Sequence, residues 1–195
     1  WGSPFYCNLA DLIIRGGTVM LDGVALEQSG GNGLWLRAGS AVTGTAVTAR
    51  QNAAHGVYLD GGRASLTGSQ LSGNGVDGAN VYQAALALEG GVLQQNGRYG
   101  VYGHNLTPVI SGTVLVSNTS DAVYLYHEGA PLDASGVRNL TLSGNAVNGL
   151  VVAGTLGGSS AMTTTAGQTY VVNGLTVPAG ASLWLPAGVV VKMKD

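Results

Sequence analysis

Aromatic and polar residues recur about every 22 positions in this sequence, and they are the residues best suited to bind or act on a ligand. Row 1 comprises Trp35, Tyr58, Asn80, Tyr102, Tyr124 and Val151. Row 2, two positions further on, comprises Arg37, Asp60, Tyr82, His104, Tyr126 and Ala153. Residues two apart share one face of a strand, so the rows predict a single aromatic and polar face suited to stacking on sugar rings. The alternative is that the rings only stack on one another and stabilise the strands.

Four residues are candidates for acid–base catalysis: Asp60, Asp77, His104 and Asp121. Asp77 and Asp121 belong to a third series, row 3, which comprises Asn32, His55, Asp77, Tyr99, Asp121 and Asn148. Two strand spacings would place these two carboxylates about 9.6 Å apart, near the upper limit for the paired carboxylates of an inverting glycosidase. Most of row 3 directly precedes glycine, a pattern typical of turns, so the turn interpretation is favoured over a catalytic pair.

One repeat is longer than the others, with an insertion between Tyr126 and Val137. Loops on a rigid scaffold often carry binding residues, so Glu128 and Asp133 are predicted to overhang the Tyr126 and His104 end of the face. The alternative is drift, because surface insertions have little effect on stability. The ligand-binding candidates are therefore Trp35, Tyr58, Tyr82, Tyr102, His104, Tyr124, Tyr126, Glu128 and Asp133.

A series of asparagines fixes the positions of these rows. Its members are Asn52, Asn74, Asn96, Asn118 and Asn145, at steps of 22 residues and a last step of 27. Three positions before them come Ala49, Leu71, Leu93, Leu115 and Leu142, and further apolar series alternate with polar ones in the manner of strands. Asparagine tolerates a left-handed turn, and its amide both donates and accepts, so stacked copies would form a ladder.

Glycines mark two bends in each repeat. Six positions before the ladder come Gly23, Ala46, Gly68, Gly90, Gly112 and Asn139, and four positions after it come Gly33, Gly56, Gly78, Gly100, Ala122 and Gly149. We expect both bends to need a positive φ. Short strands, fixed bends and this period predict an all-β parallel β-helix of about 22 residues per coil and about six to seven coils. A leucine-rich repeat is the alternative, but its signature and its helical segment are absent.

The repeats resemble a known family of folds. Leu-Ser-Gly-Asn (71–74), Leu-Gln-Gln-Asn (93–96) and Leu-Ser-Gly-Asn (142–145) each precede a strand such as Gly-Val-Tyr-Leu (56–59) or Gly-Val-Tyr-Gly (100–103). These motifs are similar to the right-handed parallel β-helix repeats of the pectin-lyase-like superfamily, over residues 12–154. The resemblance implies the fold but no single function, because the scaffold serves lyases, hydrolases, adhesins and passive fibres. The calcium-binding acids of its lyases and the motifs of its polygalacturonases have no counterparts here.

The organisation predicted is a β-helix over 1–154, with 1–11 as an incomplete first coil. Residues 155–169 lose the repeat and are expected to form a linker or loose loop. Residues 170–195 form a further strand-bearing coil or open a next module, similar to segments that open β-helix modules of large bacterial surface proteins. The chain begins at Trp1 rather than Met, so we expect a piece of a longer protein.

Composition excludes several classes of partner. The net charge is −2 with scattered Arg and Lys, so no nucleic-acid partner is expected. No stretch approaches 18 apolar residues, so no membrane insertion is expected. Cys7 is the single cysteine, which excludes an intrachain disulfide. The ten acids are dispersed, so neither a metal site nor a cofactor is predicted.

The preferred interpretation is a non-catalytic structural and recognition segment of a large secreted or cell-surface protein. Its expected partners are further β-helix modules of the same parent chain and a polysaccharide or surface glycan on the aromatic face. The alternative is a carbohydrate-active enzyme, either a polysaccharide lyase or a glycoside hydrolase, or its carbohydrate-binding module. His104, Asp60, Tyr82 and Tyr126 would then be the polar and stacking groups.

Overall fold

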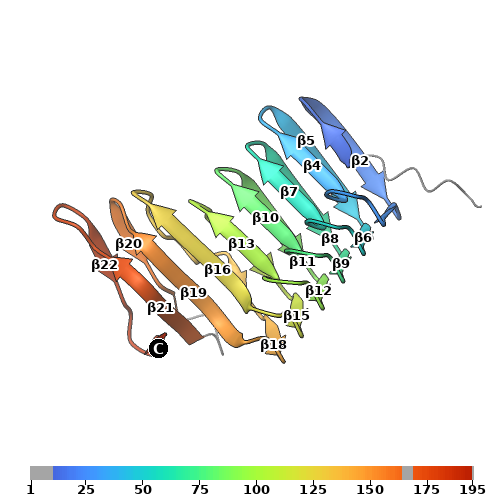
Figure 1. The fold of residues 1–195 in the computed structure, drawn as a ribbon. Coiled ribbons are helices and arrows are strands. Elements are labelled where there is room, and N and C mark those ends of the chain that lie inside the picture. Colours follow the sequence, from blue (N-terminus) through green and yellow to red (C-terminus); the bar gives the residue numbers. More distant parts are fainter. Residues whose placement is uncertain (1–10, 164–168, 195) are drawn as a thin grey trace, which may run out of the picture.

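The chain winds into a solenoid of short strands in a computed structural model that describes residues 11–163 and 169–194 (Figure 1). Every strand pair in these residues is parallel, and each strand pairs with its counterpart one coil away. The prediction of an all-β parallel solenoid with a period of about 22 residues is confirmed. None of the described elements is a helix long and apolar enough to cross a membrane.

Within the described ranges three sheets run along the solenoid. Sheet 1 has nine strands: β1 (Leu12–Ile14), β4 (Leu34–Arg37), β7 (Val57–Asp60), β10 (Ala79–Tyr82), β13 (Val101–His104), β16 (Asp121–Glu128), β19 (Val147–Thr155), β21 (Thr169–Thr176) and β23 (Val190–Met193). Sheet 2 has six: β2 (Gly17–Asp22), β5 (Ser40–Thr45), β8 (Arg63–Thr67), β11 (Ala85–Glu89), β14 (Val109–Ser111) and β17 (Val137–Arg138). Sheet 3 has six: β3 (Ala25–Glu27), β6 (Thr48–Arg50), β9 (Gln70–Ser72), β12 (Val92–Gln94), β15 (Val114–Val116) and β18 (Thr141–Ser143).

The C-terminal coils differ from the linker that the sequence predicted at 155–169. Residues 155–163 contain β20 (Ser159–Ala161), which pairs with β22 (Ser182–Trp184), and Leu156 and Met162 are buried in the core. Sheet 1 continues through β21 and β23, so the nine strands define about eight turns rather than six to seven. The 22-residue repeat is lost in this part of the sequence because sheets 2 and 3 end at β17 and β18, and a two-stranded sheet replaces them. Residues 1–10, which include Cys7 and all but the last residue of the expected first coil, and residues 164–168 and 195 lie outside the description.

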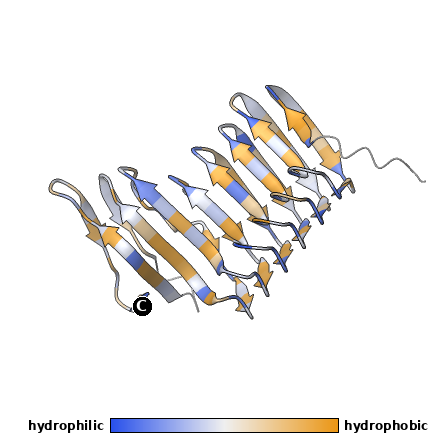
Figure 2. Cartoon of the chain, viewed as in Figure 1, coloured by the Kyte–Doolittle hydropathy of each residue, from blue (hydrophilic) through white to orange (hydrophobic). Residues whose placement is uncertain are grey.

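The core is a set of apolar columns. Leu34, Val57, Ala79, Val101 and Val123 follow one another in register along sheet 1, and all are fully buried. Figure 2 shows hydrophobic residues recurring from strand to strand, with hydrophilic residues at the bends. Because inward residues alternate with outward ones, each sheet 1 strand presents a second row of side chains to the outside.

The two glycine bends arise from different physical causes. The first was predicted correctly: Gly23, Gly68, Gly90 and Gly112 have φ between 57° and 63°, and Ala46 and Asn139 adopt φ of 50° and 53°. At the second bend the expected positive φ is wrong. A Cβ on Gly78 would lie 2.7 Å from the carbonyl oxygen of Gly100 in the next coil, and Gly56 has the same relation to Gly78. Glycine is needed there because neighbouring backbones approach closely.

The asparagine ladder links the coils as predicted. Nδ2 of Asn74 donates to Oδ1 of Asn96 at 3.0 Å and to the carbonyl of Ala49 at 3.1 Å, while the backbone N–H of Asn74 also donates to Oδ1 of Asn96. The same side-chain bond joins the other successive ladder members, Asn52 to Asn74, Asn96 to Asn118 and Asn118 to Asn145. These buried amides are satisfied by one another, so the ladder is structural.

Candidate ligand-binding face

The outer face of sheet 1 brings rows 1 and 2 together. Trp35 is in register with Tyr58, then Asn80, Tyr102 and Tyr124. Arg37, Asp60, Tyr82, His104 and Tyr126 are aligned beside them in the same manner. Strand alternation places both rows outward, while residues such as Val57 and Leu59 are buried. The predicted clustering of these aromatic side chains on one face is therefore present.

The rings on this face stack on one another along the solenoid. Tyr102 and Tyr124 have centroids 5.9 Å apart with 12° between their planes, and Tyr82 lies 4.5 Å from His104 at 14°. His104 in turn stacks on Tyr126 at 5.5 Å. Rings stacked in this way turn their faces to each other and their edges outward. The face is thus a column of ring edges and hydroxyls rather than a flat platform, and a ligand ring could stack only where the column is interrupted.

Row 3 forms the most highly connected polar cluster beside that column. The carboxylate of Asp77 is fully buried and accepts from Nε and Nη2 of Arg98 at 2.9 and 2.8 Å. It also accepts from Nδ2 of Asn80 at 2.8 Å and from the backbone N–H of Tyr99 at 3.1 Å. Burial alone would raise the pKa of Asp77, but the hydrogen bonds from His55, Arg98 and Asn80 and the charge of Arg98 lower it to about 2.

The imidazole of His55 completes this cluster. Its Nδ1 lies 3.1 Å from Oδ2 of Asp77 and 3.3 Å from the backbone nitrogen of the same residue. These two contacts require opposite roles for Nδ1. We assign the proton to Nδ1, because the shorter contact is to a carboxylate that stays ionised. His55 therefore donates to Asp77 while its ring stacks on Tyr58 at 5.5 Å.

Cations lie against both ends of a group of three tyrosines. The guanidinium carbon of Arg98 is 4.7 Å from the ring centroid of Tyr99 and 5.5 Å from that of Tyr102. At the other end, Nζ of Lys194 is 5.9 Å from the Tyr124 ring and 2.9 Å from the buried carboxylate of Asp121. Burial is the main cause of the raised pKa of the Tyr99 and Tyr102 hydroxyls, and the charge of Arg98 opposes it.

Asp77, which precedes Gly78, and Asp121, which precedes Ala122, have a larger role than that of the turn residues that the row 3 pattern favoured. Each is buried and forms an ion pair with a cation from a later coil, so the two carboxylates do not form a pair with each other. The sequence placed His55, Asp77 and Tyr99 in one row, but it did not reveal that Arg98 reaches back one coil to Asp77. Among the described residues, no group of three or more His, Cys, Asp or Glu side chains could hold a metal ion.

The inserted loop contributes one of its two predicted acids to this face. Oε2 of Glu128 lies 3.3 Å from Nε2 of His104. Asp133 instead accepts from the backbone N–H of Ser135 at 2.9 Å and forms a backbone bridge with Ala161, so its contacts are with the loop and the next coil. The loop also buries Leu132 and Ala134, because part of it continues the core rather than overhanging the face. Asp60 is half-buried in register between Arg37 and Tyr82.

Comparison with protein families agrees with this geometry. Residues 10–173 match the family model described as "Right handed beta helix region". The chain belongs to this right-handed β-helix family. A search of curated proteins gave no match. Among solved structures, this β-helix is similar to the crystal structure of the periplasmic alginate epimerase AlgG, with a TM-score of 0.52 and 14% sequence identity. The match covers 94% of this chain and 43% of that chain, and at this identity it shows the fold alone.

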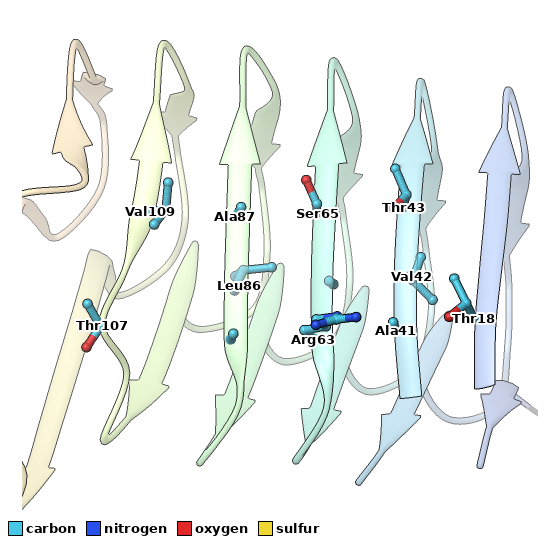
Figure 3. Close-up of a pocket in the computed structure, with 12 residues that line it drawn as sticks. Thr18, Ala41, Val42, Thr43, Arg63, Ser65, Leu86, Ala87, Thr107 and Val109 are labelled. Atoms are coloured by element: carbon cyan, nitrogen blue, oxygen red, sulfur yellow. The ribbon is translucent and has the colours of Figure 1, made fainter. Parts of the chain in front are cut away.

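The β-helix also carries a shallow groove on the outer face of sheet 2, which the sequence did not predict (Figure 3). Its volume is about 320 Å³. Small side chains form it on successive strands, with Arg63 and Val109 beside them: Thr18, Ala41, Thr43, Ser65, Ala85 and Ala87. The groove exists because these outward positions hold short side chains where sheet 1 holds rings.

Proposed function

We propose that this right-handed β-helix is a structural and recognition segment of a large extracellular or cell-surface protein. The observation that carries the proposal is that charged groups on sheet 1 are paired with one another between different coils. Asp77 is neutralised by Arg98 and Asp121 by Lys194, and Glu128 contacts His104. With a pKa of about 2, Asp77 stays a carboxylate and is unsuited to act as a general acid. These contacts stabilise coil stacking, which is what a projecting scaffold needs.

Further β-coils of the same parent chain are the proposed structural partners. Val191 continues the inward column of sheet 1 next to Tyr170, yet it is 39% exposed, and Trp184 and Met193 are exposed nearby. An apolar column of this kind is suited to stacking with another coil that presents the same column.

A polysaccharide or surface glycan is the proposed ligand of the sheet 1 face. The hydroxyl edges of Tyr58, Tyr102 and Tyr124 lie beside the polar groups of Asn80 and Arg98, which suits a ligand with many hydroxyls. An alginate epimerase shares this fold, which makes a carbohydrate the first class of ligand to test.

The second candidate is a carbohydrate-active enzyme, either a polysaccharide lyase or a glycoside hydrolase. One observation favours it: His55, Arg98 and Tyr99 gather around the buried Asp77 on the ligand-binding face. A buried carboxylate with a lowered pKa and several polar partners is a common setting for catalysis.

A screen against uronates, glucans and chitin separates the two candidates. Binding is measured on a glycan array, depolymerisation by new reducing ends and unsaturated products, and epimerisation by NMR of the recovered polymer. We expect binding without any change in the polymer. Turnover by the unaltered protein would establish the enzyme instead, and the absence of both binding and turnover would overturn the glycan ligand.

A further inference from the structure

One coil interrupts the aromatic column. In the coil of β7, His55 and Tyr58 present rings in rows 3 and 1, and in the coil of β13 Tyr99 and Tyr102 do the same. The coil of β10 between them has Asp77 and Asn80 at these positions. Two coil spacings separate the flanking rings, about 9.6 Å, which is too far for Tyr58 and Tyr102 to stack on each other.

Arg98 fills one half of this interruption. Its guanidinium lies over Asp77, because it forms two hydrogen bonds with that carboxylate while contacting the Tyr99 ring. The other half has Asn80 as its floor, with Tyr58 on one side and Tyr102 on the other. Asn80 is 9% exposed, as expected of a short side chain between taller neighbours. Arg98 borders this half, since its guanidinium carbon is 5.5 Å from the Tyr102 centroid.

We propose that the interruption over Asn80 is a subsite for a single sugar ring, held between Tyr58 and Tyr102. The proposal rests on the glycan-binding function above and specifies where it takes place. Stacked rings have centroids about 4.5–7 Å apart, so two tyrosines about 9.6 Å apart accommodate one intervening ring. Elsewhere in row 1 the rings contact each other, and no second ring can enter between Tyr102 and Tyr124.

The surroundings favour a saturated sugar ring over a planar aromatic ring. A pyranose has apolar faces and a polar rim, and the subsite provides ring faces on two sides and polar groups around them. The carbonyl of the Asn80 side chain is free to accept, because its Nδ2 donates to Asp77. Arg98 uses Nε and Nη2 for Asp77 and is 44% exposed, so Nη1 can donate to a ligand hydroxyl.

The proposal is tested by placing an aromatic ring at position 80, where the aromatic column is interrupted. Asn80→Tyr would place a third ring between Tyr58 and Tyr102 and is expected to weaken binding of the glycan found in the screen by at least tenfold, with the fold retained by circular dichroism. Asn80→Ala leaves the interruption open and is expected to weaken glycan binding by less than tenfold. Ala87→Tyr adds the same ring on sheet 2 and is the matched control, with binding unchanged.

Tyr58→Ala and Tyr102→Ala provide a second route that does not depend on Asn80→Tyr folding. Each is expected to weaken binding at least tenfold, whereas Met20→Ala, which removes an exposed side chain on β2 of sheet 2, is expected to have little effect. Glycan binding that survives Asn80→Tyr, or that survives both alanine variants, overturns the subsite while leaving the proposed function intact. A screen with no bound glycan overturns both.

Discussion

Arg98 and Asp77 form a two-bond ion pair between neighbouring coils, with Nε–Oδ1 and Nη2–Oδ2 distances of 2.9 and 2.8 Å. The pair is asymmetric: the carboxylate is fully buried, whereas 44% of the arginine side chain is exposed. Because of this asymmetry, removal of the arginine and removal of the aspartate should change the free energy of unfolding by different amounts.

Arg98→Met should destabilise the protein more than Asp77→Asn. Removing the arginine leaves a buried carboxylate without its cation, at a cost of about 3–5 kcal/mol. Asp77→Asn leaves a guanidinium that water can reach, so the loss should be smaller. Urea denaturation of both variants measures the difference. Equal losses would contradict the assigned burial of the charge.

Asn96→Ala should be among the most destabilising single changes in the ladder. Asn96 donates to Asn118 and to the Leu71 carbonyl and accepts from Asn74. Its removal leaves several buried polar groups without hydrogen-bond partners, at a cost of roughly 3 kcal/mol or more. Asn96→Asp should be at least as destabilising, because the second carboxylate oxygen would face the oxygens of Leu71 and Asn118. The free energy of unfolding checks both, and a loss near zero for either would show that water replaces the ladder.

Exchanges between glycine and alanine should change stability in opposite directions at the two bends. Gly78→Ala brings a Cβ to 2.7 Å from the Gly100 carbonyl, and we expect a loss of about 1–3 kcal/mol. Ala46→Gly relieves a left-handed alanine with φ of 50° and should raise stability by about 1 kcal/mol. Thermal unfolding of the two variants in parallel is the measurement. A stabilising Gly78→Ala would refute the close-approach explanation.

Stability should fall as the pH falls below about 6.5 because of His127. This side chain is fully buried, and neither ring nitrogen forms a hydrogen bond of regular geometry, although the backbone of Ala130 lies close enough to favour the charged form. Burial lowers its pKa, the backbone of Ala130 offsets part of that change, and the nearby His104 lowers it further. A group whose folded pKa is lowered in this way binds its proton more readily when unfolded, so stability is full above 6.5 and declines with acidification.

His127→Leu should flatten this pH dependence between about pH 7 and 5, since the fully buried imidazole that would gain a charge is removed. The midpoint of thermal unfolding as a function of pH is the readout, with His104→Asn as the comparison. If wild type and His127→Leu lose stability in parallel, another group is responsible.

The sequence predicted those features that repeat in every coil. Asn74 and Asn96 have the same surroundings one coil apart, so their spacing reveals the ladder, and the rows of sheet 1 follow from its phase. Features made by one side chain reaching out of its own coil were missed. Arg98 crosses to the preceding coil, and Lys194 contacts Asp121 across 73 residues of sequence. The burial of His127 was missed because the inserted loop, seen as a surface feature, also extends the core.

The ladder bonds have one further consequence for how such a protein can vary in length. Each internal asparagine makes the same contacts with the coil before it and the coil after it. Deletion of a 22-residue unit, such as 75–96, would therefore join equivalent positions and shorten the rod by about 4.8 Å without altering the ends. The molecule can thus change its length in discrete steps, and deletion of 75–96 would also remove Asn80 and bring Tyr58 and Tyr102 into neighbouring coils.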